Sequence, residues 1–156
     1  MLNYNDPVLR EFGKTPRCKV IFFSSSEELE SGVFLRGDTM IIKENGVETP
    51  VCTTKDTSLV GMHNYENIMA AIAMTHAMGV PLDTIRQGIK EFTAVEHRIE
   101  FVTEKNGVKY YNDSKGTNPD AAIKAVYAMP SPTILIGGGY DKKSSYDEWV
   151  ATFEGR

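Results

Sequence analysis

The chain has 156 residues, 41% of them apolar and 24% charged, and its net charge is −4. This length fits one domain or two small ones, and the composition is ordinary for a globular protein. The acidic balance argues against a general nucleic-acid binder, which usually carries a basic excess. The apolar runs at residues 20–23 and 134–136 are far too short to cross a bilayer, and no signal peptide is visible. We therefore expect a soluble, cytoplasmic protein with no membrane or nucleic-acid partner.

Helix and strand signals alternate through the first 60 residues. Asp6 is a suitable cap for a helix whose first position is Pro7. Residues 19–24 contain a continuous apolar run, at 20–23, and predict a strand buried on both faces. Asn45 and Gly46 tolerate positive φ, so they predict a hairpin turn. Short strands are expected at residues 32–35, 40–42 and 47–52.

Two helices are expected next. Asn64 is a plausible N-cap for the first helix, and Gly79 with Pro81 ends it. The second helix carries apolar side chains at a helical spacing, namely Leu82, Ile85, Ile89 and Phe92. The pattern returns to strands near residues 93–97, which predicts a domain boundary there.

The last third of the chain predicts a strand–helix–strand unit. Residues 99–103 and 108–112 are strand candidates joined by a hairpin turn at 105–107, and Asn118 opens a helix. A short buried strand is expected at 133–136, so residues 108–136 would form a βαβ unit. A final helix is expected near 146–153, and we expect an α/β domain that is cut short.

The two cysteines and three histidines predict no metal centre. Cys18 and Cys52 are too few for a disulfide framework or a zinc site; a single bridge is the alternative to two reduced, buried thiols, which we expect. His63, His76 and His97 lack the spacing of zinc ligands. We expect His63 to cap or pack near a hinge and His76 to be partly buried.

The sharpest candidate site is the segment 111–119, between a strand and a helix. In open α/β sheets ligands bind at this edge, and the helix N-terminus favours an anion. Lys115 adds a positive charge, Thr117 a hydroxyl, and Asp113 an acceptor for a ribose hydroxyl or a metal-bound water. The alternative interpretation is a plain capped turn, since these residue types are common there.

A second candidate segment, 136–143, contains three consecutive glycines followed by Lys142. Glycines let a ligand approach the backbone, although neither a dinucleotide fingerprint nor a Walker A loop is present. If the βαβ unit forms, Lys115, Thr117 and Lys142 converge on one sheet edge and suit a small anionic substrate. A flexible loop with solvated charges is the alternative.

Arg98 can hold a phosphate or stack on a base. The alternative is a surface arginine that begins a strand.

Several of these motifs together resemble one known family. The runs GMHNYEN (61–67), EHR (96–98), NDSKGTNP (112–119) and GGGYDK (137–142) occur in the order seen in the Mur ligases, and NYND (3–6) is similar to that family's N-x-D-D stretch. The resemblance implies a three-domain, ATP-dependent ligase. It implies that residues 1–95 are the last part of the central ATPase domain and that residues 96–156 are the first half of the Rossmann-like C-terminal domain.

The resemblance also implies an activity. It is the MgATP-dependent addition of D-glutamate to UDP-N-acetylmuramoyl-L-alanine through an acyl phosphate, for bacterial peptidoglycan. Asn3 would lie near the adenine, Arg98 would contact the nucleotide phosphate or ribose, and Asp113 would contact the ribose or a metal-bound water. Lys115 would be the catalytic lysine near the γ-phosphate and the incoming amino acid. Thr117 and Lys142 would contact the D-glutamate carboxylate.

The departures from the family pattern limit what this chain can do. Gly116 stands where alanine is usual. The resemblance places the phosphate-binding loop and the magnesium ligands outside this chain, so we expect no ATP turnover by these residues alone. Open sheet edges favour dimerisation. The alternatives to a D-glutamate-adding ligase are another Mur-type ligase, a folylpolyglutamate synthase, and a non-catalytic binding or assembly module.

Overall fold

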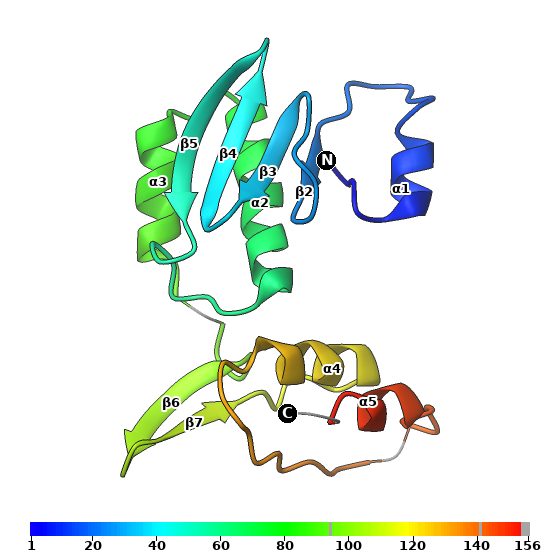
Figure 1. The fold of residues 1–156 in the computed structure, drawn as a ribbon, viewed down its shortest axis with the longest axis vertical. Helices are drawn as coiled ribbons and strands as arrows, with labels where there is room; N and C mark the ends of the chain where they lie inside the picture. Colours follow the sequence, from blue (N-terminus) through cyan, green and yellow to red (C-terminus); the bar gives the residue numbers. More distant parts are fainter. Residues whose placement is uncertain (94, 141, 154–156) are drawn as a thin grey trace. The chain divides into compact units, whose positions relative to one another are not determined.

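The computed structural model describes residues 1–93, 95–140 and 142–153 of the chain (Figure 1). The chain forms two compact units, of which the first is Met1–Thr93. Each unit has its own secondary structure. The assignment of residues 1–95 and 96–156 to parts of two ligase domains stays a prediction.

The first unit is built on a five-stranded sheet with the order β1-β2-β3-β4-β5. β1, β2 and β3 run parallel, whereas β3, β4 and β5 are antiparallel neighbours. Asn45 and Gly46 have φ values of 53° and 78°, which confirms the predicted hairpin turn. The strands are β1 (Leu2–Asn3), β2 (Phe22–Ser24), β3 (Gly32–Arg36), β4 (Thr39–Glu44) and β5 (Val47–Thr53).

Strand β2 is shorter than the predicted strand at 19–24. Only Phe23 and Ser24 pair with β3, because β3 begins at Gly32 and gives the earlier residues no partner on that side. Gly32 has a φ of 131°, and a Cβ there would lie 2.3 Å from the Phe22 carbonyl oxygen. The close approach of the two strands therefore requires a glycine.

Helix α1 (Pro7–Phe12) begins as the sequence predicts. The Asp6 carboxylate accepts from the backbone N–H groups of Val8 at 2.8 Å and Leu9 at 3.0 Å. These bonds satisfy two of the donors that a helix N-terminus leaves without partners, and Pro7 has no N–H to satisfy.

Helices α2 (Met62–Ala77) and α3 (Leu82–Glu91) cover one face of the sheet (Figure 1). Gly79, with a φ of 80°, follows α2 as predicted. The predicted N-cap was wrong: the cap is Gly61, and Asn64 lies inside the first turn, where its amide donates to the Val60 carbonyl at 2.8 Å. No helix of the described residues is long and apolar enough to span a membrane.

The main apolar core of the first unit lies between this face and the two helices. Met40, Met69 and Ile72 are fully buried there. A smaller cluster on the other face of the sheet contains Phe34 and Ile41. Alternate residues of β3 and β4 thus serve opposite faces, as the strand geometry requires.

The second unit contains a two-stranded sheet and two short helices. Asn106 and Gly107 have φ values of 54° and 77°, so the second predicted hairpin is confirmed. The Asn118 side chain accepts from Ala121 N at 2.9 Å and caps α4, also as predicted. The elements are β6 (Glu100–Lys105), β7 (Val108–Asn112), α4 (Pro119–Ala128) and α5 (Asp147–Ala151).

The predicted buried strand at 133–136 is absent. These residues form no regular element, and Ile134 and Ile136 are 95% and 94% exposed. A strand needs a hydrogen-bonded neighbour and an apolar cover, but among the described residues β6 and β7 pair only with each other. The predicted βαβ unit therefore does not form.

The two thiols differ in exposure and should differ in reactivity. Both cysteines are free, but Cys18 is exposed, so the prediction that both are buried was wrong for it. Burial raises the pKa of the Cys52 thiol to about 11.

Because the thiolate is the nucleophile, we expect only Cys18 to react with a disulfide reagent in the native chain at pH 8. Titration in denaturant should reveal the second thiol; rapid native modification of a Cys18→Ser variant would contradict this.

Candidate functional site

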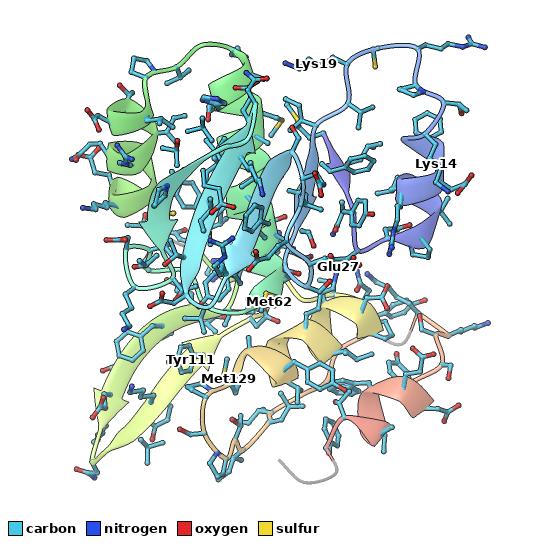
Figure 2. The ribbon with its side chains drawn as sticks, turned by 45° about the horizontal axis from the view of Figure 1, so that its top comes forward. Lys14, Lys19, Glu27, Met62, Tyr111 and Met129 are labelled. Carbon is cyan, nitrogen blue, oxygen red and sulfur yellow. The ribbon has the colours of Figure 1, made fainter. Side chains whose placement is uncertain are left out.

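The turn between β7 and α4 holds three of the site residues predicted from the sequence, Asp113, Lys115 and Thr117. Its backbone is closed by two short-range bonds, from Gly116 N to the Asp113 carbonyl at 2.8 Å and from Thr117 N to the Lys115 carbonyl at 2.9 Å. Tyr111, on β7 just before the turn, is labelled in Figure 2. The turn leads directly into the capped N-terminus of α4, where an anion is favoured.

The same turn is bonded to the segment that precedes β6. The Lys115 N–H donates to the His97 carbonyl at 2.9 Å, and the Ile99 N–H donates to Asp113 Oδ1 at 3.0 Å. The Asn112 side-chain Nδ2 also lies 2.8 Å from His97 Nδ1. Arg98 therefore lies between two residues that are both anchored to the turn.

These anchors hold an uncommon backbone conformation. His97 and Ile99 have φ values of 66° and 47°, and positive φ is disfavoured for a β-branched residue. Ile99 is also buried, at 8% exposure. Sequence reasoning missed this arrangement, since no local pattern signals a bond between residues 15 positions apart, such as that of His97 with Asn112.

The Asp113 carboxylate makes contacts within the chain, in addition to any contact with a ligand. One carboxylate oxygen accepts the Ile99 N–H, and the other lies over Gly116, where a Cβ would be 2.4 Å from it. Gly116 thus makes room for the carboxylate at the position where the family resemblance would place alanine. The remaining acceptor capacity of Asp113 is what a ligand can use.

Lys142 and Thr117 lie together, as the sequence predicts, although not for the predicted reason. Lys142 Nζ donates to the Thr117 carbonyl oxygen at 3.3 Å. The expected route was a βαβ unit with both segments at strand ends, and that unit is absent. The contact is made instead by the irregular segment that follows α4.

The three glycines of this segment have different roles. A Cβ at Gly137 would lie 3.1 Å from the Trp149 ring, so Gly137 allows this segment to pack on α5. Gly138 has open space around it, and Gly139 has a φ of 130° that favours glycine. Asp141, part of the motif recognised in the sequence, lies outside the described residues.

Positive charge dominates the predicted site residues. Within residues 1–93, 95–140 and 142–153, no acidic side chain forms an ion pair with Arg98, Lys115 or Lys142, and all three are exposed. Exposed cations near a helix N-terminus attract phosphates and carboxylates. The arrangement therefore suits an anionic ligand.

Metal-ligating side chains do not cluster among the described residues. No group of three histidine, cysteine or acidic side chains is close enough together, in the part of the chain described, to hold a metal ion. Asp113, the carboxylate that the resemblance links to a metal-bound water, has one oxygen occupied by Ile99 N–H.

The remaining predicted residues lie in the first unit. Asn3 is the last residue of β1, and its Oδ1 accepts the Asn5 N–H at 2.9 Å. His76 is partly buried, as expected, with its Nε2 3.4 Å from Glu44 Oε2. His63 is the second residue of α2.

Comparison of the sequence with curated proteins gives extensive matches. The UDP-N-acetylmuramoylalanine--D-glutamate ligase of Lachnoclostridium phytofermentans is 51% identical over 154 residues, which are 99% of this chain and 34% of that ligase. The same ligases of Lachnospira eligens and of a Thermoanaerobacter species are 49% and 45% identical, again over 34% of their lengths. A scan against protein-family models finds no match.

Solved structures share the fold at low sequence identity. A UDP-N-acetylmuramoylalanyl-D-glutamyl-2,6-diaminopimelate--D-alanyl-D-alanyl ligase from Acinetobacter baumannii aligns with 80% of this chain and 28% of its own, with a TM-score of 0.59 and 20% identity. A pseudomurein peptide ligase type C from Methanothermus fervidus aligns with 84% of this chain and 34% of its own, with a TM-score of 0.58 and 17% identity.

The proteins that this chain resembles, in sequence or in fold, are of one class: they are ligases, and the mixed α/β fold of this chain matches a part of each solved structure. Within that class, the curated sequences similar to this chain at 45–51% identity are D-glutamate ligases. The chain spans about a third of the length of these relatives.

The bond between Asp113 and Ile99 can be tested without a ligand. Asp113→Ala removes the acceptor, and we expect the Ile99 amide to exchange with solvent roughly tenfold faster, because a hydrogen bond to a charged group contributes about 1.5 kcal/mol. Asp113→Asn is the matched control, since its side-chain carbonyl still accepts the N–H. Hydrogen exchange followed by NMR measures both, and equal protection in the alanine variant would contradict this assignment.

Proposed function

We propose that the longer protein to which this chain corresponds is a D-glutamate-adding Mur ligase. The observation that carries the proposal is the 51% identity over 99% of this chain to a ligase of that name. The carboxylate of UDP-N-acetylmuramoyl-L-alanine would attack the γ-phosphorus of ATP, giving an acyl phosphate and ADP. The amine of D-glutamate would then attack the acyl carbon, so that phosphate leaves, a proton is released and an amide forms.

The contribution of residues 112–142 would be positioning and charge neutralisation. Thr117 and Lys142 are in contact and would bind the D-glutamate carboxylate, with Lys115 near the γ-phosphate and the incoming amine. Fixed positive charges stabilise the negative charge of the transferring phosphoryl group without reorganising. Holding the amine close to the acyl carbon supplies the rest of the effect.

Three of the predicted site residues would contact the nucleotide. Asn3 would lie near the adenine, and Arg98 and Asp113 would contact the ribose or a phosphate. The bonds that anchor His97 and Ile99 to the turn support this role for Arg98, because they fix the backbone on either side of it. ATP with Mg²⁺ would be the cofactor, and the metal ligands would lie outside this chain. The activity would take place in the bacterial cytoplasm and serve peptidoglycan synthesis, and through it cell shape and division.

A second candidate is an assembly function for this chain on its own. The segment 134–136 is largely exposed and apolar, and the β6–β7 sheet has open edges within the described residues. Such edges and patches favour pairing with a second copy. Light scattering after size-exclusion chromatography separates the two cases, because a monomer at all concentrations would exclude this assembly.

D-Glutamate binding is the first test of the site. On titration we expect the amides of Lys115, Thr117 and Lys142 to shift with D-glutamate and to shift less with L-glutamate, as followed by NMR. Lys142→Gln should weaken the effect about tenfold, since it removes a charged partner of the carboxylate. Lys124→Gln, an exposed lysine of α4, should leave it unchanged. Equal responses to the two enantiomers would count against D-glutamate specificity.

ATP turnover is the second test. We expect no phosphate release from ATP by the 156-residue chain, even with D-glutamate and the UDP-sugar substrate present, because the phosphate-binding loop is proposed to lie elsewhere. A full-length relative such as the Lachnoclostridium phytofermentans ligase is the positive control. Substrate-dependent phosphate release by the purified chain alone would refute the proposed division of labour.

A further inference from the structure

Strand β5 is an outer strand of the sheet in the first unit. Among the described residues it has β4 as a neighbour on one side and no strand on the other. It is also long for an edge strand, with seven residues. The free side of such a strand carries backbone N–H and C=O groups that pair readily with another extended chain. The structure therefore raises the question of what keeps this edge from joining two molecules.

The pairing of β5 with β4 is interrupted in the middle of the strand. Met40 pairs with Cys52, whereas the next residue of β4, Ile41, pairs with Pro50. Val51 is therefore an extra residue on β5, which is the arrangement of a β-bulge. Successive carbonyl groups of a regular strand point to opposite sides. The extra residue breaks this alternation, so that two successive carbonyls face the same way.

One side chain of helix α3 binds both of these carbonyl groups. Arg86 Nε donates to the Val51 carbonyl oxygen at 3.2 Å, and Nη2 donates to the Pro50 carbonyl oxygen at 2.7 Å. The third nitrogen, Nη1, donates to Asp83 Oδ1 at 2.8 Å. Figure 1 shows α3 beside β5, which is why a side chain of this helix reaches the strand. The planar guanidinium suits two acceptors that lie close together.

These bonds occupy the part of the edge that the bulge exposes. A hydrogen-bond donor lies in the direction in which a carbonyl group points, so the guanidinium stands where the N–H groups of a pairing strand would have to lie. Pro50 has no N–H, and proline within a sheet is typical of edge strands. The middle of β5 therefore offers an incoming strand neither a free carbonyl nor, at Pro50, a donor.

Charge repulsion between side chains does not protect this edge. Natural edge strands often carry charged side chains that keep a second strand away. The charged residue of β5 is Glu48, and its carboxylate is neutralised by Arg36 at 2.8 Å and Lys43 at 3.2 Å. The protection therefore depends on the backbone contacts of Arg86.

We propose that Arg86 blocks pairing at the free edge of β5 and so prevents this strand from joining the β5 strand of a second copy of the chain. A second copy is the partner that the edge fits, because an edge strand can pair antiparallel with itself about a two-fold axis. The inference does not depend on the ligase activity. It concerns a different surface from segment 134–136 of the second unit.

The test measures self-association of the 156-residue chain. Arg86→Met keeps an apolar side chain of similar width on α3 and removes all three donors. The variant should dimerise at a concentration at least about tenfold below that required by the unsubstituted chain, because two charge-assisted hydrogen bonds no longer occupy the edge. Light scattering after size-exclusion chromatography, over a series of concentrations, measures the change. Hydrogen exchange followed by NMR should show newly protected amides in Val47–Thr53 of the dimer.

Two further variants control for charge and for folding. Lys90→Met removes the same charge from the same helix, where the ammonium lies 3.9 Å from Asp56 Oδ1, and should associate like the unsubstituted chain. Arg86→Lys keeps the charge but lacks the planar fork that binds two carbonyls. It should show a smaller increase in association, and it replaces Arg86→Met if that variant does not fold.

Several results would overturn the inference. One is a folded Arg86→Met variant whose association is unchanged. Equal association of Lys90→Met would assign the effect to net charge, and a dimer without new protection in β5 would place the contact elsewhere. The unsubstituted chain gives a test without any substitution: if its β5 amides gain protection as its concentration rises, Arg86 does not block the edge.

Discussion

The packing of helix α2 against the parallel part of the sheet is the interaction on which the first unit depends. Met69 and Ile72 of this helix are fully buried against strand residues such as Val33 and Met40. Deleting side chains of this kind typically costs 2–5 kcal/mol, which is a large share of the stability of a small domain. The same packing brings Glu66, one turn before Met69, to the ends of β1 and β2. The apolar core thereby positions Glu66, whose Oε1 accepts from Asn5 Nδ2 at 3.1 Å.

The second unit is held by different means. Ile99 and Thr152 are the buried residues among its described positions, and the face of its hairpin is exposed. Its order comes from hydrogen bonds between the 97–99 segment and the turn at 112–116, and from contacts between aromatic rings such as Phe101 and Tyr111, whose centroids are 5.7 Å apart. A unit with so little buried surface gains little stability from the hydrophobic effect. Each of these hydrogen bonds therefore contributes a larger share of the stability of the local structure.

This contrast explains which features the sequence could predict. Signals confined to a few residues were reliable: Asp6 caps its helix, and the turns at 45–46 and 106–107 form as expected. The strand predicted at 133–136 failed because a strand depends on a partner elsewhere in the chain, which local hydrophobicity cannot reveal. Asn64 has the side chain of a cap, but its amide bonds backward to Val60, and only the path of the chain before α2 determines this.

Within the candidate site, the sequence predicted one contact but not the hydrogen bonds that support the site residues. The expected neighbours Thr117 and Lys142 are in contact, although the strand that was to bring them together is absent. Asn3 and Asp113 show a common feature that no motif predicts: each gives one side-chain oxygen to a backbone N–H, of Asn5 and of Ile99. What remains on each side chain is then a restricted set of donors or acceptors. The backbone bonds thus decide which polar atoms of the motif residues are left to recognise a ligand.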